Sequence, residues 1–432
     1  MAGAPDDDRT PITFDPAFAL TGLSRAQLAV LGREWMMHGH LQDRAGMPLF
    51  HEGRSREEMQ AVAIDEWMGA SPAYAKRMQR ALRFEGDTVP TIFKNLQLDI
   101  GAPHEYLDFR LTPHDDNHGE FFLAHCGALM DVEPMGEEYV HGMCHTVEDP
   151  TFDATAVATN PRAQVRPLHR PPRVPTDRTP HCHWTVTIDP SFPPVSPHPN
   201  LALVTASRAG GITVDDPGPG AEPGGRDDYS GPFDPDFALE VLSQRALVVT
   251  LQEIAVQSHL LLRSFCLAVS ERIGADATLA MVARMAVGLG AVTSERLRRA
   301  FVFDDGAAGL AALLQVHPFF WPRTYVHPVI ECDGEQVRFA LRADAAVFAE
   351  DDDFTWLASM PGAGDRAMAA IAWGFDRRAA VERAEPNPGE RCAYTISVDP
   401  AAEPSPEPAE VSLTKFSTGA AFTFTRLRPV GD

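Results

Sequence analysis

The residues best suited to chemistry are concentrated in one stretch of the chain, between Asp115 and His183. Within it, the segment HGMCHTVED (141–149) places His141, Cys144, His145 and Glu148 at positions i, i+3, i+4 and i+7. On an α-helix this spacing puts all four side chains on one continuous face. Two imidazoles, a thiol and a carboxylate pack poorly in a core but ligate metal ions well. We therefore expect a functional site in this stretch, whereas a solvated helix face with satisfied histidines is the alternative for any single residue.

Two further cysteines extend the predicted ligand set. Strand alternation in GEFFLAHC (119–126) puts Cys126 on the face of His118 and Glu120, and His125 on the opposite face. Without a bulge, Cys126 and His125 cannot both reach one ion. The predicted metal ligands are Cys126, His141, Cys144, His145 and Cys182. Sulfur and nitrogen ligands favour a divalent zinc or iron ion, and Glu148 or Asp149 is the predicted catalytic base for a metal-bound water.

A basic segment follows in this otherwise acidic chain. The sequence NPRAQVRPLHRPPR (160–173) contains several arginines, which suit bidentate capture of a carboxylate or phosphate. A solvated strand paired with acidic neighbours explains these arginines equally well. The predicted substrate-binding side chains are His118, His125, Arg166, Arg170 and His183.

The order of these features resembles a known family. A cysteine that closes a strand (Cys126), the acidic helix CHTVEDPTFD (144–153), an arginine-bearing strand and the strand CHWTV (182–186) are similar to the L-2-amino-thiazoline-4-carboxylic acid hydrolase-like family. More distantly, they resemble vinyl-reductase-type ligand-binding domains. The resemblance implies hydrolysis of a small cyclic amidine acid and makes Cys126, Cys144 and Cys182 the shared thiol positions. The additional histidines and the second copy of the unit are departures from that pattern.

Composition limits the class of protein. The chain has 432 residues, of which 44% are hydrophobic, and a formal net charge of −23. Such a charge disfavours nucleic acid or an anionic membrane as a partner. The sequence leaves the oligomeric state open. The acidic start MAGAPDDDRT lacks the features of a secretion signal, and the apolar stretch 246–269 is interrupted by polar residues. We expect a cytoplasmic protein with six free cysteines.

The elements that must position these residues occur twice. FDPAFALTGLS (14–24) recurs as FDPDFALEVLS (233–243), and HCHWTVTIDP (181–190) recurs as RCAYTISVDP (391–400). We predict a first repeat over 12–214, an exposed Gly/Pro/Asp-rich linker over 215–231 and a second repeat over 232–427. Each repeat is expected to begin with long helices capped by Ser24 and Ser243 and to end in antiparallel strands. The predicted fold class is α+β, a tandem duplication packed as a pseudo-twofold pair.

The candidate chemistry occurs in the first repeat only. His125 and Cys126 correspond to Ala343 and Asp344, and HGMCHTVED corresponds to WLASMPGAGD (356–365), which has no His or Cys. Cys182 is the exception, because Cys392 is its counterpart. Glu34 and His40 recur as Glu253 and His259, which we interpret as structural pairs. The second repeat is thus expected to supply shape, interface or a lid.

These patterns predict a metal-dependent enzyme that acts on a small carboxylate-bearing substrate, by hydrolysis of a C–N bond. Redox-active iron at the same ligands would instead give an oxidoreductase or lyase. A non-catalytic metal or small-ligand sensor is the alternative from another class.

Overall fold

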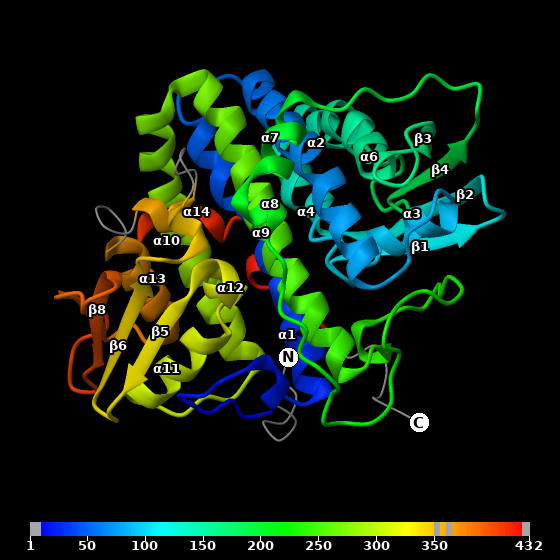
Figure 1. Ribbon diagram of the computed structural model, residues 1–432. Coiled ribbons are helices and arrows are strands. Elements are labelled where there is room, and N and C mark those ends of the chain that lie inside the picture. Colours follow the sequence, from blue (N-terminus) through cyan, green and yellow to red (C-terminus); the bar gives the residue numbers. More distant parts are fainter. Residues whose placement is uncertain (1–9, 350–354, 360–364, 426–432) are drawn as a thin grey trace.

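The computed structural model describes residues 10–349, 355–359 and 365–425 (Figure 1). It is 51% helix and 15% strand, with two separate four-stranded antiparallel sheets, which confirms the α+β class. Figure 1 shows the two sheets on opposite sides of the long helices α1 (Arg25–His51) and α9 (Gln244–Ile273). Each sheet is covered by helices of its own unit.

The elements of the first unit agree closely with the sequence pattern. Its further helices are α2 (Arg56–Ala81), α3 (Val89–Leu96), α4 (Gly127–Val132), α5 (Glu137–His141), the π-helix η4 (Gly142–Val147), α6 (Glu148–Val157), α7 (Pro199–Ala206) and α8 (Arg208–Gly211). Its strands are β1 (Leu107–Pro113), β2 (His118–Cys126), β3 (Ala163–His169) and β4 (Cys182–Ile188). Ser24 caps α1 in a reciprocal arrangement with Gln27, as predicted.

The second unit repeats this order. Its further helices are α10 (Ala275–Ala300), α11 (Gly306–Val316), α12 (Arg323–Val326), α13 (Asp365–Phe375) and α14 (Ala409–Thr414). Its strands are β5 (Pro328–Cys332), β6 (Gln336–Arg342), β7 (Ala379–Ala384) and β8 (Glu390–Val398). The sheets have equivalent strand orders, β1-β2-β4-β3 and β5-β6-β8-β7. The predicted cap Ser243 accepts a hydrogen bond from the Ala246 amide at the start of α9.

Glycines on α1 allow α9 to approach closely. A Cβ added at Gly32 would lie 3.2 Å from Leu251, and one added at Gly46 would lie 2.7 Å from the ring of Phe265. Between them, Gly39 faces Ser258. Each of these glycines is separated from its partner on α9 by the same number of residues as Ser24 is from Ser243. Equivalent positions of the two units therefore meet. Side chains on α9 thus fill the space left by the glycines, and this contact forms the centre of the core.

Ion pairs between the units are reciprocal. Glu34 of α1 forms a buried bidentate pair with Arg296 of α10, with contacts of 2.8 and 3.1 Å. Glu253 of α9 pairs with Arg77 of α2 at 2.9 Å. Glu253 is the counterpart of Glu34, and Arg296 is the counterpart of Arg77, at the offset that relates Ser24 to Ser243. Each unit therefore contributes its glutamate to one pair and its arginine to the other. A local twofold would produce this exchange, although the twofold itself remains a prediction.

The linker is more firmly attached than its composition predicts. Tyr229 is buried, donates a hydrogen bond of 2.8 Å to Gln97 and stacks on Phe237 with 4.6 Å between ring centroids. Its carbonyl accepts a hydrogen bond from Lys94. The prediction of an exposed linker is therefore wrong at this residue, because one aromatic ring buries enough apolar surface to anchor a Gly- and Pro-rich segment.

One helix in the described part of the chain, α10, is long and apolar enough by length and composition to cross a membrane. However, 78% of its most apolar window is buried inside the protein. The glycines of α10 contact other elements of the second unit, with Gly290 facing Ile371. Packing within the fold accounts for its composition.

Candidate functional site

A bulge in β2 turns Cys126 into the interior. Leu107 of β1 pairs with Cys126, whereas Phe109 pairs with Leu123, so two residues of β2 lie opposite Asp108. Cys126 consequently joins Phe121 and Leu123 on the buried face. The expectation that strict alternation holds to the end of this strand is wrong, because the extra residue shifts the alternation by one position.

The predicted helix face is divided in two by the π-helix η4. Cys144 is buried and points inward with Glu148, while His141 is exposed and its ring stacks on His145 at a centroid distance of 3.9 Å. The Nε2 atom of His145 lies 2.7 Å from the Pro171 carbonyl oxygen. A π-helix has wider turns than an α-helix, so residues at i and i+3 no longer share a face. His141 and His145 therefore do not join the thiols, contrary to the predicted ligand set.

Three thiols and Glu148 do come together. Burial, followed by the neighbouring Glu148 carboxylate, raises the pKa of Cys126 to about 12 and the pKa values of Cys144 and Cys182 well above the usual range. Within the described residues, no group of three or more His, Cys, Asp or Glu side chains is arranged to hold a metal ion. In this arrangement the three cysteines are neutral, buried thiols.

The predicted substrate-binding residues make their contacts elsewhere, although the charge of Arg170 is close enough to oppose the rise that burial causes in the pKa values of Cys144 and Glu148. His118 contacts Asp115 in the β1–β2 turn, and His183 lies 3.0 Å from Glu120 on the partly exposed face of the sheet. Each of the other three contacts a different part of the chain. The ring of His125 stacks on Phe422 of the second unit, Arg166 pairs with Asp153, and Arg170 pairs with Asp149.

Asp149, the other predicted base, is therefore held at the surface by Arg170. Arg166 and Arg170 both use their charge on carboxylates of the chain itself, so the predicted anion clamp is not formed. Glu148 is the only one of the two predicted catalytic carboxylates that faces the interior. Adjacent residues on a helix point about 100° apart, which separates the two side chains.

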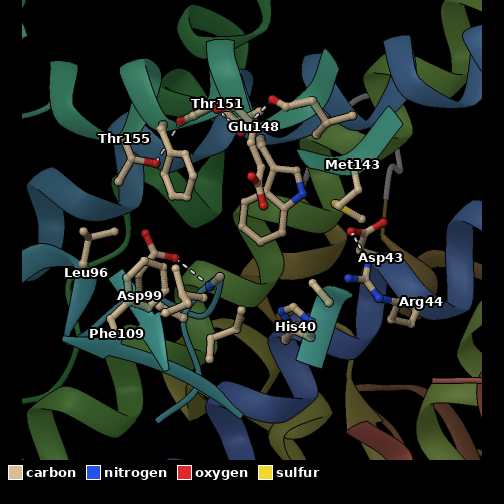
Figure 2. Close-up of a pocket in the computed structure, with 18 of the residues that line it drawn as sticks. His40, Asp43, Arg44, Leu96, Asp99, Phe109, Met143, Glu148, Thr151 and Thr155 are labelled. Carbon is tan, nitrogen blue, oxygen red and sulfur yellow. Dashed lines mark hydrogen bonds and ion pairs between the residues drawn. The ribbon is translucent and has the colours of Figure 1, made fainter. Parts of the chain in front are cut away.

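A cavity of about 120 Å³ lies between the helices and the sheet of the first unit. Figure 2 shows Glu148, Thr151 and Thr155 on one side, with His40, Asp43 and Arg44 of α1 across from them and Asp99 nearby. Phe109, Leu123 and Phe152 supply apolar wall. We call this cavity the chamber.

Two polar groups in the chamber have no hydrogen-bond partner. Both ring nitrogens of His40 and the Oε2 atom of Glu148 are buried and unbonded. Although the Glu148 residue retains some exposure, burial of its carboxyl group raises its pKa to about 8 against the opposing effect of Arg170. Burial, and then the charge of Arg44, lowers the pKa of His40 to about 3. At pH 7 the imidazole is neutral and the Glu148 carboxyl group is protonated, so both can bond to a ligand.

Asp99 provides a carboxylate of different character. It accepts hydrogen bonds of 2.9 Å from the Tyr74 hydroxyl and 2.7 Å from the Gly101 amide. Burial raises its pKa to about 6, and the two hydrogen bonds oppose this rise. Asp99 is therefore mostly ionised at pH 7, whereas Glu148 is mostly protonated.

The remaining charge in the chamber is locally balanced. Arg44 pairs with Asp43 at 2.8 Å and with Asp131 at 3.0 Å. The fully buried Glu66 lies behind this wall, where burial and then Asp43 raise its pKa well above the usual range. The chamber is thus rich in carboxyl groups, and its one guanidinium is already paired.

Sequence reasoning did not identify His40, Asp43, Glu66 or Asp99 as site residues. A signal was nevertheless available, because α2 and α10 have matching bounds at the same numbering offset as Ser24 and Ser243. At that offset, Asp43, Glu66 and Tyr74 correspond to Leu262, Met285 and Thr293. The carboxyl groups of Asp43 and Glu66 thus occur only in the first unit, whereas His40 and Arg44 recur as His259 and Arg263.

Comparison with protein-family models, with curated proteins and with solved structures gives no match. The resemblance to the thiazoline carboxylic acid hydrolase-like family remains a prediction. The inference of function therefore depends on the chamber and its chemistry.

Thiol reactivity provides a direct test of this arrangement. Cys332 is partly exposed, whereas the other five cysteines are buried. Since the thiolate is the reactive form, we expect one thiol per native chain to react rapidly with a disulfide reagent at pH 8, and six after unfolding. Cys332→Ser should abolish the rapid phase. A second rapidly reacting thiol would contradict the burial of Cys126, Cys144 and Cys182.

Proposed function

We propose that the first unit is an enzyme that hydrolyses a C–N bond in a small substrate bound within the chamber. The observation that carries this proposal is the pair of buried, unbonded groups, His40 and the Oε2 atom of Glu148, in the lining of one cavity. Buried polar groups without partners are rare in folded proteins and cost free energy. A substrate that bonds to both would offset that cost.

The two carboxyl groups support opposite roles in proton transfer. Asp99 accepts a proton from a water molecule as its oxygen bonds to the substrate carbon, and protonated Glu148 gives its proton to the departing nitrogen as the C–N bond breaks. A pair of acids whose pKa values are separated by their surroundings suits such a division. The predicted role of Glu148 as a base is therefore replaced by that of an acid, since its pKa of about 8 keeps the proton in place at neutral pH.

The charges favour a substrate with a basic nitrogen on an unsaturated carbon, such as an amidine. Asp99 is ionised, and Arg44 is already neutralised by Asp43 and Asp131. A cation in the chamber would gain attraction from Asp99, while a free carboxylate would compete with Asp43 and Asp131 for one guanidinium. The carboxylate expected on the substrate is accordingly not part of this proposal.

Hydrolysis can be measured as ammonia or amine released from a panel of small cyclic and linear amidines and amides. We expect turnover of at least one amidine and a bell-shaped pH dependence of kcat/KM. The limbs should lie near pH 6, where Asp99 becomes protonated, and near pH 8, where Glu148 loses its proton. If amidines bind but none is turned over at any pH, the enzyme proposal fails and a small-ligand sensor is favoured.

Metal binding is a second candidate, supported by the mutual electrostatic effect of the three thiols, which would have to move closer together to share one ion. Bound zinc or iron would stabilise the thiolate forms of Cys126, Cys144 and Cys182. Elemental analysis of the protein purified without added metal would then find about one ion per chain, and Cys144→Ser should lower it well below that value. Cys332→Ser is the matched control. Absence of metal from the parent protein would exclude this candidate, including its redox and lyase variants.

We also infer that the two units are related by an internal twofold and that the protein works in the cytoplasm on a small molecule. The reciprocal Glu34–Arg296 and Glu253–Arg77 pairs support the twofold. The formal charge of −23 supports the exclusion of nucleic acid and anionic membranes as partners.

A further inference from the structure

A second cavity of about 570 Å³ lies beside the chamber, and we call it the vestibule. Apolar side chains dominate its lining, among them Met47, Met59, Met130, Met135, Tyr139 and Phe416. Met135 and Phe416 are 48% and 38% exposed, although large apolar side chains are normally covered. Exposure of these two lining residues places the opening of the vestibule beside them.

The vestibule and the chamber share a wall. Asp43, Arg44, Trp67, Met143 and Val147 line both cavities. The shared wall contains the Asp43–Arg44 ion pair, so the polar end of the vestibule adjoins the polar chamber. The two cavities adjoin at these residues, so a molecule that passes between them would have its polar part in the chamber and its apolar part in the vestibule.

We propose that the vestibule binds the apolar body of the substrate whose basic nitrogen enters the chamber. The substrate class is thus an amidine that carries an alkyl or aryl group, and alkylamines are non-hydrolysable probes of the same contacts. The position of the nitrogen in the chamber is taken from the proposed function, on which this inference rests. The chamber alone, at about 120 Å³, has room for a small polar head, whereas the vestibule falls in the usual size range of small-molecule sites.

The methionines suit such an occupant. Their unbranched, polarisable side chains adapt to apolar groups of different shape, which is common at surfaces that bind varied apolar ligands. The vestibule should therefore select ligands by the volume of their apolar group more than by its exact shape. Tyr139 and Trp67 add aromatic faces, on which an alkyl chain or a ring can pack.

The second unit forms part of the vestibule through Leu413, Phe416 and Thr418. This segment is fixed by Asp131 of the first unit, which accepts hydrogen bonds of 2.7 Å from the Ser417 hydroxyl and from the amide and hydroxyl of Thr418. The unit that lacks the charged chamber residues thus supplies one wall of the site.

Calorimetric titration with n-butylamine, n-hexylamine and n-octylamine tests this proposal without requiring turnover. Because each buried methylene contributes about 0.8 kcal/mol, the affinity should rise about fourfold per added carbon. Leu413→Ala should weaken n-octylamine binding about three- to tenfold and leave n-butylamine nearly unchanged. Leu203→Ala is the matched control, because Leu203 is the counterpart of Leu413 in the first unit and is exposed.

The outcomes separate this inference from the proposed function. An affinity that does not change with chain length, or equal effects of Leu413→Ala and Leu203→Ala, would refute the binding of an apolar group in the vestibule. Chain-length dependence that is reduced by Leu413→Ala but not by Leu203→Ala would support it, even if Glu148→Gln left turnover intact and so refuted the acid. n-Octanol should bind less tightly than n-octylamine, and equal affinity would remove the basic nitrogen from the substrate class.

Discussion

Glu148→Gln should lower kcat on an amidine substrate by about 10² to 10⁴ while the protein keeps its fold. The amide has nearly the same shape as the protonated carboxyl group and can still donate a hydrogen bond, but it cannot give up a proton to the departing nitrogen. Because KM reflects contacts that the amide preserves, the loss should fall on kcat. The limb of the pH profile near 8 should disappear with it.

Asp149→Asn is the matched control for this variant. Asp149 is the next residue along the same helix, but it is paired with Arg170 outside the chamber. We expect its replacement to change kcat less than threefold, within the range of about 0.5 kcal/mol typical of substitutions outside the core. Equal losses in the two variants would refute the role of Glu148 as the acid.

Stability gives an independent measurement of the same carboxyl group. Burial raises the pKa of Glu148 from 4.5 to about 8, so the folded chain binds this proton more tightly than the unfolded chain. Its contribution to stability is therefore complete below about pH 4.5 and is lost as the pH rises through about 8. Urea unfolding of Glu148→Gln should lack this decline, which remains visible in Asp149→Asn.

Arg296→Met should destabilise the protein by about 3 to 5 kcal/mol, as measured by urea unfolding. The substitution leaves Glu34 buried between the two units without its bidentate partner, and the carbonyl of Phe422 loses its hydrogen bond. Burial already raises the pKa of Glu34 despite the presence of Arg296. The unpaired carboxyl group should therefore take up a proton, and the loss should grow as the pH rises.

The reciprocal variant provides the comparison. Arg77→Met removes the equivalent pair with Glu253, but the Arg77 side chain is 14% exposed against 2% for Arg296, so its loss should be smaller. The double variant Glu34→Leu with Arg296→Met should recover most of the stability, since a buried ion pair replaced by apolar side chains is often neutral. If the double variant is as unstable as Arg296→Met, the unpaired carboxylate is not the cause.

The sequence by itself determined the elements and the class of fold. Ser24 and Ser243 as helix caps, the bounds of α9 and the buried alternation of Cys182, Trp184, Val186 and Ile188 were all predictable. These features depend on interactions between residues close in sequence, namely capping hydrogen bonds and the periodicity of one helix or strand. Comparison of the two copies also predicts, from sequence alone, that the candidate site belongs to the first unit.

Only the tertiary structure decided which of those residues meet. The β2 bulge and the π-helix η4 bring Cys126, Cys144 and Glu148 inward and leave His141 and His145 outside. Both irregularities insert one residue into a regular period, and their positions depend on packing between elements rather than on residue type. His40 and Asp99 lie on separate elements, and only the assembled fold places both in the lining of one cavity with Glu148. Their burial, which sets the pKa values of the site, is a property of the assembled fold.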